Sequence, residues 1–225
     1  MTTNLEKLVN DVFHGNTEGE INAAVNFKTD DWRLYSASYL YASKVMISEV
    51  LKTNCKNDLL IYPILFCIRH HLELSFKYFI CLLNKKFDCK PQFIKNHNLE
   101  KLWLIIKNAL KKSEYFKEQL DSDFIKQIDT VVNLFNDYDV GSFTFRYPVV
   151  SNENTDSAFR NLKCISYDKL EELHGEIATI FEVFGLHLEH LGDQIIDFKM
   201  FQEYFDYEFS DSVNESLRSI GNRLN

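Results

Sequence analysis

Apolar residues recur every three or four positions along most of the chain, the spacing that places them on one face of an α-helix. Between residues 29 and 53 they run from Trp32 to Val50 at this interval. Residues 57–84 are apolar almost all round, which predicts a helix buried at the centre of the protein. The whole pattern predicts helices at about 3–13, 29–53, 57–84, from 97 onward, and at 119–138, 168–190, 193–207 and 211–225.

One segment departs from the helical spacing. From Phe143 to Val149 every second residue is large and apolar, and the turn-like Asn152-Glu153-Asn154 follows. Alternation with a period of two is typical of a β-strand. We therefore predict an all-α helical bundle of about six to eight helices with a small β-hairpin near 143–165. Because no repeat or Pro/Ser-rich linker interrupts the chain, residues 1–225 are expected to form a single domain.

The composition is that of a helical protein with reduced cysteines. With 45% hydrophobic residues but only 7 Gly and 3 Pro, the chain has little material for the turns of a β-sandwich or barrel. Its 5 Cys form no C-x-x-C pair, and its first residues lack the features of a signal peptide, so we expect a cytoplasmic protein. Residues 59–83 are apolar but carry charges near their middle, which favours a core helix and no membrane association.

The net charge of −8 is distributed unevenly along the chain. Residues 1–76 carry −2 and residues 127–225 carry −11, whereas residues 77–126 carry 11 basic and 6 acidic side chains, a charge of +5. A basic segment on one side of the bundle could bind phosphate groups even though the whole protein is acidic. Alternatively, these lysines lie on solvated helix faces without a specific partner.

Four polar side chains share one side of the central predicted helix. At 100° per residue, Arg69, Glu73 and Lys77 fall at about 0°, 40° and 80° around the axis, and His70 falls at about 100°. Charged groups on so apolar a helix need partners, because a desolvated charge without one costs several kcal/mol. Two interpretations stay open, a network of ion pairs that ties helices together and the floor of a functional pocket.

Three further residues are candidates to meet this polar stripe. His97 is expected at a helix N-terminus, where it could be a neutral general base or simply a capping or surface residue. Asp139 and Arg146 frame the predicted hairpin, where they could form a structural clamp or contact a substrate. Since buried charges require compensation, we expect His97 and Arg146 to lie within about one pocket's width of Arg69 and Glu73.

These residues together resemble a known family. The segments that carry the resemblance are Tyr62-Pro63, Arg69-His70-x-x-Glu73-x-x-x-Lys77, His97-x-Leu99-x-x-Leu102-Trp103 and Phe145-Arg146-Tyr147-Pro148. Over roughly residues 30–190 the chain is similar to bacterial proteins grouped with HEPN-like folds. The resemblance implies a helical bundle, often dimeric, and many HEPN proteins are metal-independent ribonucleases of toxin–antitoxin, abortive-infection and CRISPR-associated systems. Their usual signature, an Arg followed by four to six residues and then a His, does not occur in this chain.

We therefore expect a HEPN-like protein of a bacterial defence or toxin system, with RNA as the candidate substrate. The candidate catalytic residues are Arg69, His70, Glu73, His97 and Arg146, and the candidate substrate-binding residues are Lys77 and Asp139. In this interpretation a histidine moves protons while the arginines stabilise phosphate charge. The alternative is a non-catalytic HEPN-like module that uses the same site for a ligand or a dimer contact.

The expected partners follow from the same interpretation. Aromatic residues make up 14% of the chain, enough to expose an apolar patch, so we expect a homodimer. A cognate antitoxin or another protein of the defence system is the second expected partner. No metal or cofactor is expected, because the sequence has no Gly-rich phosphate loop, no paired-cysteine zinc motif and no recognised histidine signature for zinc.

Overall fold

The computed structural model describes residues 31–54, 57–87, 91, 95–113, 116, 123–139, 142, 144–146 and 164–221, together with Leu5, Val9 and Val12. At residues 57, 198, 199 and 201–221 the description covers the backbone alone. The chain divides into two compact units, Met1–Asp31 and Trp32–Asn225. Of the helix predicted at 3–13, only Leu5, Val9 and Val12 are described, and all three are helical. A single domain over residues 1–225 stays a prediction.

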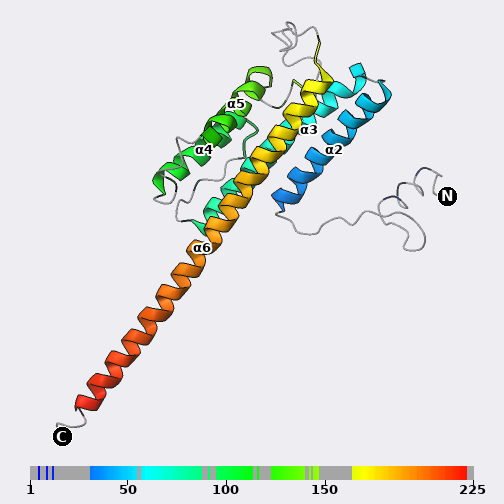
Figure 1. The fold of residues 1–225 in the computed structure, drawn as a ribbon. Coiled ribbons are helices and arrows are strands. Elements are labelled where there is room, and N and C mark those ends of the chain that lie inside the picture. The colour runs from blue at the N-terminus through cyan, green and yellow to red at the C-terminus, as the bar shows by residue number, and fades with distance from the viewer. Residues whose placement is uncertain are drawn as a thin grey trace. The chain divides into compact units, whose positions relative to one another are not determined.

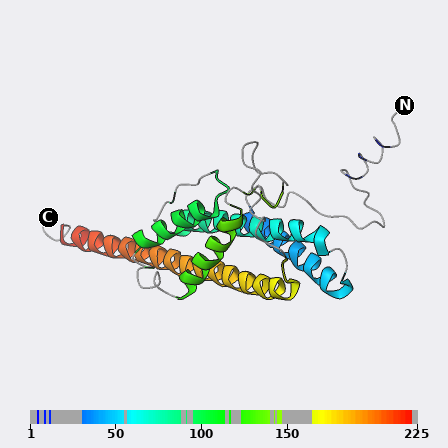
Figure 2. The ribbon, with the colours of Figure 1, turned by 90° about the horizontal axis from the view of Figure 1, so that it is seen from above.

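The described part of the second unit is built from helices, as predicted. They are α2 (Trp32–Thr53), α3 (Asn57–Lys86), α4 (Leu99–Lys112), α5 (Asp123–Tyr138) and α6 (Tyr167–Gly221). Helix α3 contacts α2, α4 and α6, while α2 also contacts α6, and α5 contacts α4 and α6. Figures 1 and 2 show α2, α3 and α6 side by side. The all-α class is confirmed. In the described residues the structure gives the first and last residue of five helices, instead of the six to eight predicted.

The number of helices is lower partly because the end of the chain forms one helix, where the sequence predicts three. Helix α6 runs without interruption from Tyr167 to Gly221. Gly192 lies between two of the predicted segments, and a Cβ atom there would come within 2.5 Å of Lys86 Cδ and 2.7 Å of Lys86 Cβ. The glycine therefore allows α6 to pass close to the end of α3, and it does so inside a continuous helix.

The β-hairpin predicted near 143–165 is not confirmed. Residues 144–146 form a turn, residues 164–166 lead into α6, and no strand occurs in the described residues, while 147–163 lie outside them. The backbone N–H of Thr144 donates to Asp139 Oδ1 at 3.1 Å, which fixes the turn to the end of α5. Phe145 is buried against Phe135, with ring centroids 6.4 Å apart. At Phe145 the apolar signal thus reflects an aromatic side chain that a turn inserts into the core.

Helix α3 is the centre of the core. Its side chains at Ile64, Ile68, Leu72 and Phe76 are fully buried, and Phe76 stacks on Trp103 of α4 with ring centroids 5.6 Å apart. By length and composition α3 could cross a membrane, because its most apolar window has a mean hydropathy of 1.2. However, 61% of that window is buried within the protein, which is typical of a core helix.

Candidate functional site

The polar stripe of α3 converges on one carboxylate. The Glu73 side chain is fully buried, and its Oε2 atom lies 3.0 Å from Arg69 Nη1. Its Oε1 atom accepts hydrogen bonds from Lys77 Nζ at 2.7 Å and from His97 Nδ1 at 2.9 Å. The Nδ1 atom of His70 lies 3.8 Å from Oε2, beyond hydrogen-bond length but close enough for an ion pair when His70 is protonated. One buried carboxylate is thus surrounded by four basic side chains.

This environment keeps Glu73 ionised. Burial alone would raise the pKa of the carboxyl group, because desolvation penalises the charged form. Contacts with His70, Lys77 and His97 outweigh burial and hold the pKa of Glu73 well below its usual range. A fixed negative charge is therefore present at the centre of the cluster at neutral pH.

Arg69 connects this cluster to two other parts of the chain. Its side chain is fully buried, and Nη2 donates a hydrogen bond to the backbone carbonyl of His97. Its Nε atom lies 3.4 Å from both the carbonyl oxygen and Oδ2 of Asp139. Burial lowers the pKa of Arg69, and the charges of Asp139 and Glu73 oppose that shift. Since an arginine titrates far above neutral pH, it stays charged and holds the segment before α4 and the end of α5 against α3.

His97 lies beside the N-terminus of α4, directly before the cap residue. Helix α4 begins at Leu99, and Asn98 is its N-cap, with its side chain accepting from the backbone N–H of Lys101 at 2.9 Å. His97 therefore precedes the cap and takes no part in it. A carboxylate oxygen only accepts, so the contact with Glu73 favours the His97 tautomer with its proton on Nδ1. The side chain is 62% exposed, and Nε2 is the nitrogen left to accept a proton.

Arg146 lies beside the cluster and is exposed. Its guanidinium group lies 5.7 Å from the centroid of the Phe66 ring, which stacks on the ring of His70 at 5.4 Å. The Nε atom donates to the carbonyl of Ser142 at 2.5 Å, which ties the side chain to its own turn. The charge of Arg146 also lowers the pKa of Arg69, so it is near enough to add to the electrostatic field of the site.

The seven candidate residues identified in the sequence lie in one region of the structure. Arg69, Glu73, Lys77 and Asp139 are buried within it, and the Lys77 Nζ atom also lies 5.4 Å from the Trp32 ring centroid. Two side chains, those of His97 and Arg146, are exposed, and His70 is partly exposed. The arrangement thus combines an accessible imidazole on a fixed carboxylate with a nearby cation, which suits proton transfer near an anionic group.

Sequence reasoning missed a second polar cluster between α2, α3 and α6. Ser36 Oγ lies 2.8 Å from His71 Nδ1 and 2.7 Å from Ser75 Oγ, and Ser43 Oγ lies 3.0 Å from His174 Nε2. All five side chains are buried. The sequence feature that could have indicated this cluster is the spacing of Ser36 and Ser43. Residues seven apart lie on the same face of a helix, and both serines lie on the buried face of α2.

Comparisons with known proteins identify no relative. The chain matches no family model, and searches among curated proteins and among solved structures return no significant match. Function must therefore be inferred from the geometry of the site.

Proposed function

We propose that this protein is a HEPN-like, metal-independent ribonuclease of a bacterial defence or toxin system, with His97 as its acid–base residue. The observation that supports this proposal is the pair formed by His97 and Glu73. A buried carboxylate 2.9 Å from Nδ1 fixes the orientation and tautomer of a largely exposed imidazole. A carboxylate that holds a histidine in this way prepares the other nitrogen for proton transfer and stabilises the imidazolium that results.

The proposed reaction uses the ribose of the substrate as the nucleophile. His97 Nε2 takes the proton of a 2′-hydroxyl, the 2′-oxygen bonds to the adjacent phosphorus, and the bond from phosphorus to the 5′-oxygen breaks. His70, which lies next to the same carboxylate, acts in its protonated form and gives that proton to the departing 5′-oxygen. Arg146 offsets negative charge on the phosphate as the transition state forms. This chemistry needs a 2′-hydroxyl, so RNA and not DNA is the proposed substrate class.

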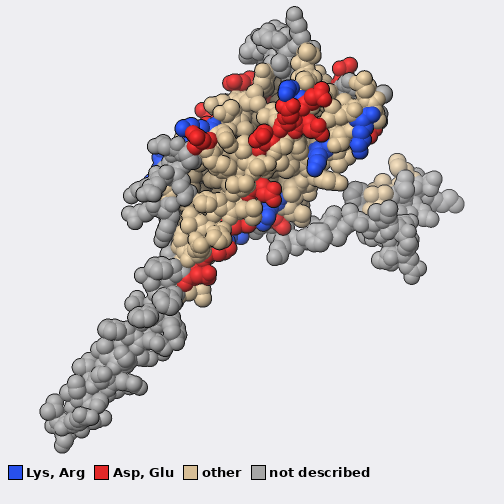
Figure 3. All heavy atoms as spheres, in the orientation of Figure 1, with Lys and Arg blue, Asp and Glu red and all other residues tan. Residues whose placement is uncertain are grey.

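The distribution of charge favours one direction of approach for a polyanion. Figure 3 shows acidic side chains gathered near the start of α6, where Asp168, Glu171, Glu172 and Glu176 are exposed. An RNA strand would be repelled from that face. Helix α4, which begins two residues after His97, exposes Lys101, Lys111 and Lys112, so we propose that RNA approaches along this helix.

Incubation of purified protein with total RNA and tRNA, with and without EDTA, tests the proposal. We expect cleavage that EDTA does not abolish, no cleavage of DNA, and products with a cyclic 2′,3′-phosphate end. His97→Gln should reduce the rate by about 100-fold or more, because a general acid or base contributes at least that factor. The matched control is His190→Gln, an exposed histidine on α6 that should leave the rate unchanged. Intact RNA in every sample, or full activity in His97→Gln, would refute the proposal.

The burial of Arg69, Glu73 and Asp139 favours a second function, in which these three residues only stabilise the fold. In that case the protein is a non-catalytic HEPN-like module whose exposed residues at this site bind a ligand or a partner. Arg69→Ala separates the two functions. If it lowers the melting temperature by several degrees without removing any measurable activity, the module is the better description.

Assembly into a homodimer belongs to the same proposal. On α2, Leu34, Tyr41 and Val45 lie within about 40° of each other around the helix axis and are 44%, 70% and 49% exposed. An apolar stripe of this kind is typical of a contact surface, either with a second copy or with an antitoxin-like partner. Light scattering at micromolar concentration should give twice 26.5 kDa, and Tyr41→Glu should reduce it to the monomer mass. A wild-type mass of 26.5 kDa contradicts the dimer.

A further inference from the structure

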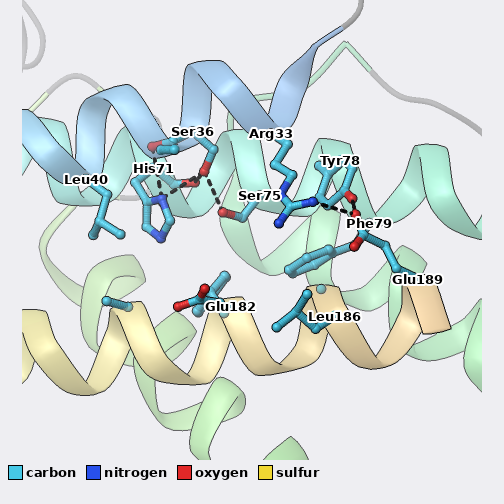
Figure 4. Close-up of a pocket in the computed structure, with 14 residues that line it drawn as sticks. Arg33, Ser36, Leu40, His71, Ser75, Tyr78, Phe79, Glu182, Leu186 and Glu189 are labelled. Atoms are coloured by element: carbon cyan, nitrogen blue, oxygen red, sulfur yellow. Dashed lines mark hydrogen bonds and ion pairs between the residues drawn. The ribbon is translucent and has the colours of Figure 1, made fainter.

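A cavity of about 260 Å³ lies between α2, α3 and α6. Figure 4 shows it from the side, with Ser36 and Leu40 from α2, His71 and Phe79 from α3, and Leu186 from α6 around it. His71 is two residues from both Arg69 and Glu73, which at 100° per residue puts it roughly on the opposite side of α3. The cavity is therefore separate from the site around Glu73, and nothing in the proposed ribonuclease reaction uses it.

The hydrogen bonds around His71 determine which of its nitrogens carries the proton. Nδ1 lies 3.1 Å from the carbonyl oxygen of Ser36 and 2.8 Å from its Oγ. A carbonyl only accepts, so the proton must be on Nδ1 for this contact to be favourable. The Ser36 hydroxyl then donates to the carbonyl of His71 at 3.0 Å, and Ser75 donates to Ser36 Oγ at 2.7 Å. Every donor in this group has an acceptor, which leaves Nε2 as an unprotonated acceptor.

That acceptor has no partner in the part of the chain that the structure describes. The His71 side chain is only 5% exposed, and its Nε2 atom is buried without a hydrogen bond from any described residue. A buried acceptor without a donor destabilises a protein, and native proteins rarely retain one. In Figure 4 the imidazole points from α3 toward α6, into the space that the lining residues enclose. A donor that enters the cavity would satisfy it.

The size and lining of the cavity define what could enter. A water molecule takes about 30 Å³ of liquid volume, and a cavity of about 150 Å³ is enough for benzene, so this space is large enough for one or two small rings. The aromatic rings of Phe79 and Phe181 lie in its wall, stacked with centroids 6.0 Å apart. Such a wall favours a flat, largely apolar molecule over a chain of waters.

The charged rim argues against an anion. Arg33 at the rim is already paired with Glu189 at 3.0 Å, and Tyr78 donates a hydrogen bond to the same carboxylate. Glu182, on the exposed side of the lining, adds a second negative charge. One cation and two carboxylates give the rim a net negative charge, so an anionic ligand would be repelled.

We propose that this cavity binds a small, neutral, mostly apolar ring compound that carries one N–H or O–H group, and that this group donates a hydrogen bond to His71 Nε2. Ring stacking and burial supply affinity, and the single acceptor supplies selectivity. The site does not rest on ribonuclease activity, so either proposal can fail without the other.

A matched pair of probes tests the role of Nε2 in the wild-type protein. Indole and benzofuran have nearly the same shape, but only indole carries an N–H donor. Calorimetry or ligand-observed NMR at neutral pH should show saturable binding of indole that is about three- to tenfold tighter than that of benzofuran, the range expected for one net hydrogen bond. Equal affinities would show an apolar cavity without the proposed recognition, and no saturable binding of either probe up to its solubility would overturn the site altogether.

Two variants place the binding event in this cavity. His71→Leu should remove the preference for indole, and Ala178→Leu, which adds bulk to the lining from α6, should weaken both probes at least tenfold. Thr179→Leu is the control, because residue 179 is exposed on the same helix and does not line the cavity. Unchanged binding in Ala178→Leu, with the variant folded, would place the probes elsewhere. Because the probe comparison uses the wild-type chain, the proposal stays testable if a variant does not fold.

Discussion

Replacement of Glu73 by glutamine is the most direct test of the buried network. The change keeps the shape of the side chain and removes its charge. Among the described residues, Arg69, which is fully buried, would keep only Asp139 as a counter-charge, and Lys77 would lose the carboxylate 2.7 Å from its Nζ. One oxygen of Glu73 would also become an NH₂ group that faces a cation or the imidazole of His97. The network would then contain unpaired positive charge without a compensating change elsewhere.

The expected cost is about 3 to 5 kcal/mol of unfolding free energy, the range seen when one partner of a buried ion pair is removed. For a chain of this length that corresponds to a melting temperature lowered by roughly 6 to 20 °C. Because the pKa of Glu73 is depressed, its stabilising effect is present above the ordinary glutamate pKa of about 4.3 and is lost as the pH falls below it. The difference between wild type and Glu73→Gln should therefore be constant near neutral pH and shrink in acid.

Urea unfolding followed by circular dichroism measures this difference, with Glu172→Gln as the control. Glu172 pairs with Lys169 at 2.7 Å on the surface, where both side chains are more than half exposed, so its loss should change stability by less than about 0.5 kcal/mol. Adding Lys77→Met to Glu73→Gln should recover part of the loss, since it removes one unpaired cation. A cost for Glu73→Gln below about 0.5 kcal/mol would refute a stabilising role for the buried charge of Glu73.

Two further predictions concern other parts of the fold. Burial lowers the pKa of His71 to about 4, so between pH 6.5 and pH 4 the unfolded chain binds a proton that the native protein does not, and stability should fall as the pH falls by up to about 3 kcal/mol. His71→Gln should reduce the change of unfolding free energy with pH across this window, as measured by urea unfolding. The reduction should be partial, because the pKa of His174 is lowered as well. Gly192→Ala should destabilise the protein by about 1 to 3 kcal/mol, since the new Cβ would lie 2.7 Å from Lys86 Cβ, whereas Gly175→Ala meets nothing within 4 Å and should stabilise α6 by roughly 0.5 to 1 kcal/mol. Thermal melts should give a lower melting temperature than wild type for Gly192→Ala and a higher one for Gly175→Ala.

The sequence by itself determined the class of fold and the position of most helices. The period of apolar residues is a local property, so α2, α3 and α5 could be placed to within a few residues, and α3 could be recognised as the core helix. The same local geometry put Arg69, Glu73 and Lys77 on one side of α3. Desolvation then required that other segments bring partners to them, which is why His97 and Arg146 could be proposed as neighbours.

Only the tertiary structure decided what these residues contact. Glu73 meets His97 from 24 positions away, and Arg69 meets Asp139 from 70 positions away. Both contacts depend on where the tertiary structure places the segment before α4 and the segment after α5 relative to α3. The predicted hairpin illustrates the limit, because alternating apolar residues indicate a strand only if a second strand pairs with them. Phe145, one of the alternating residues, lies in a turn that buries it. The acceptor at His71 could not be predicted for the same reason. Its tautomer depends on a carbonyl of α2, and its cavity exists only where three helices meet.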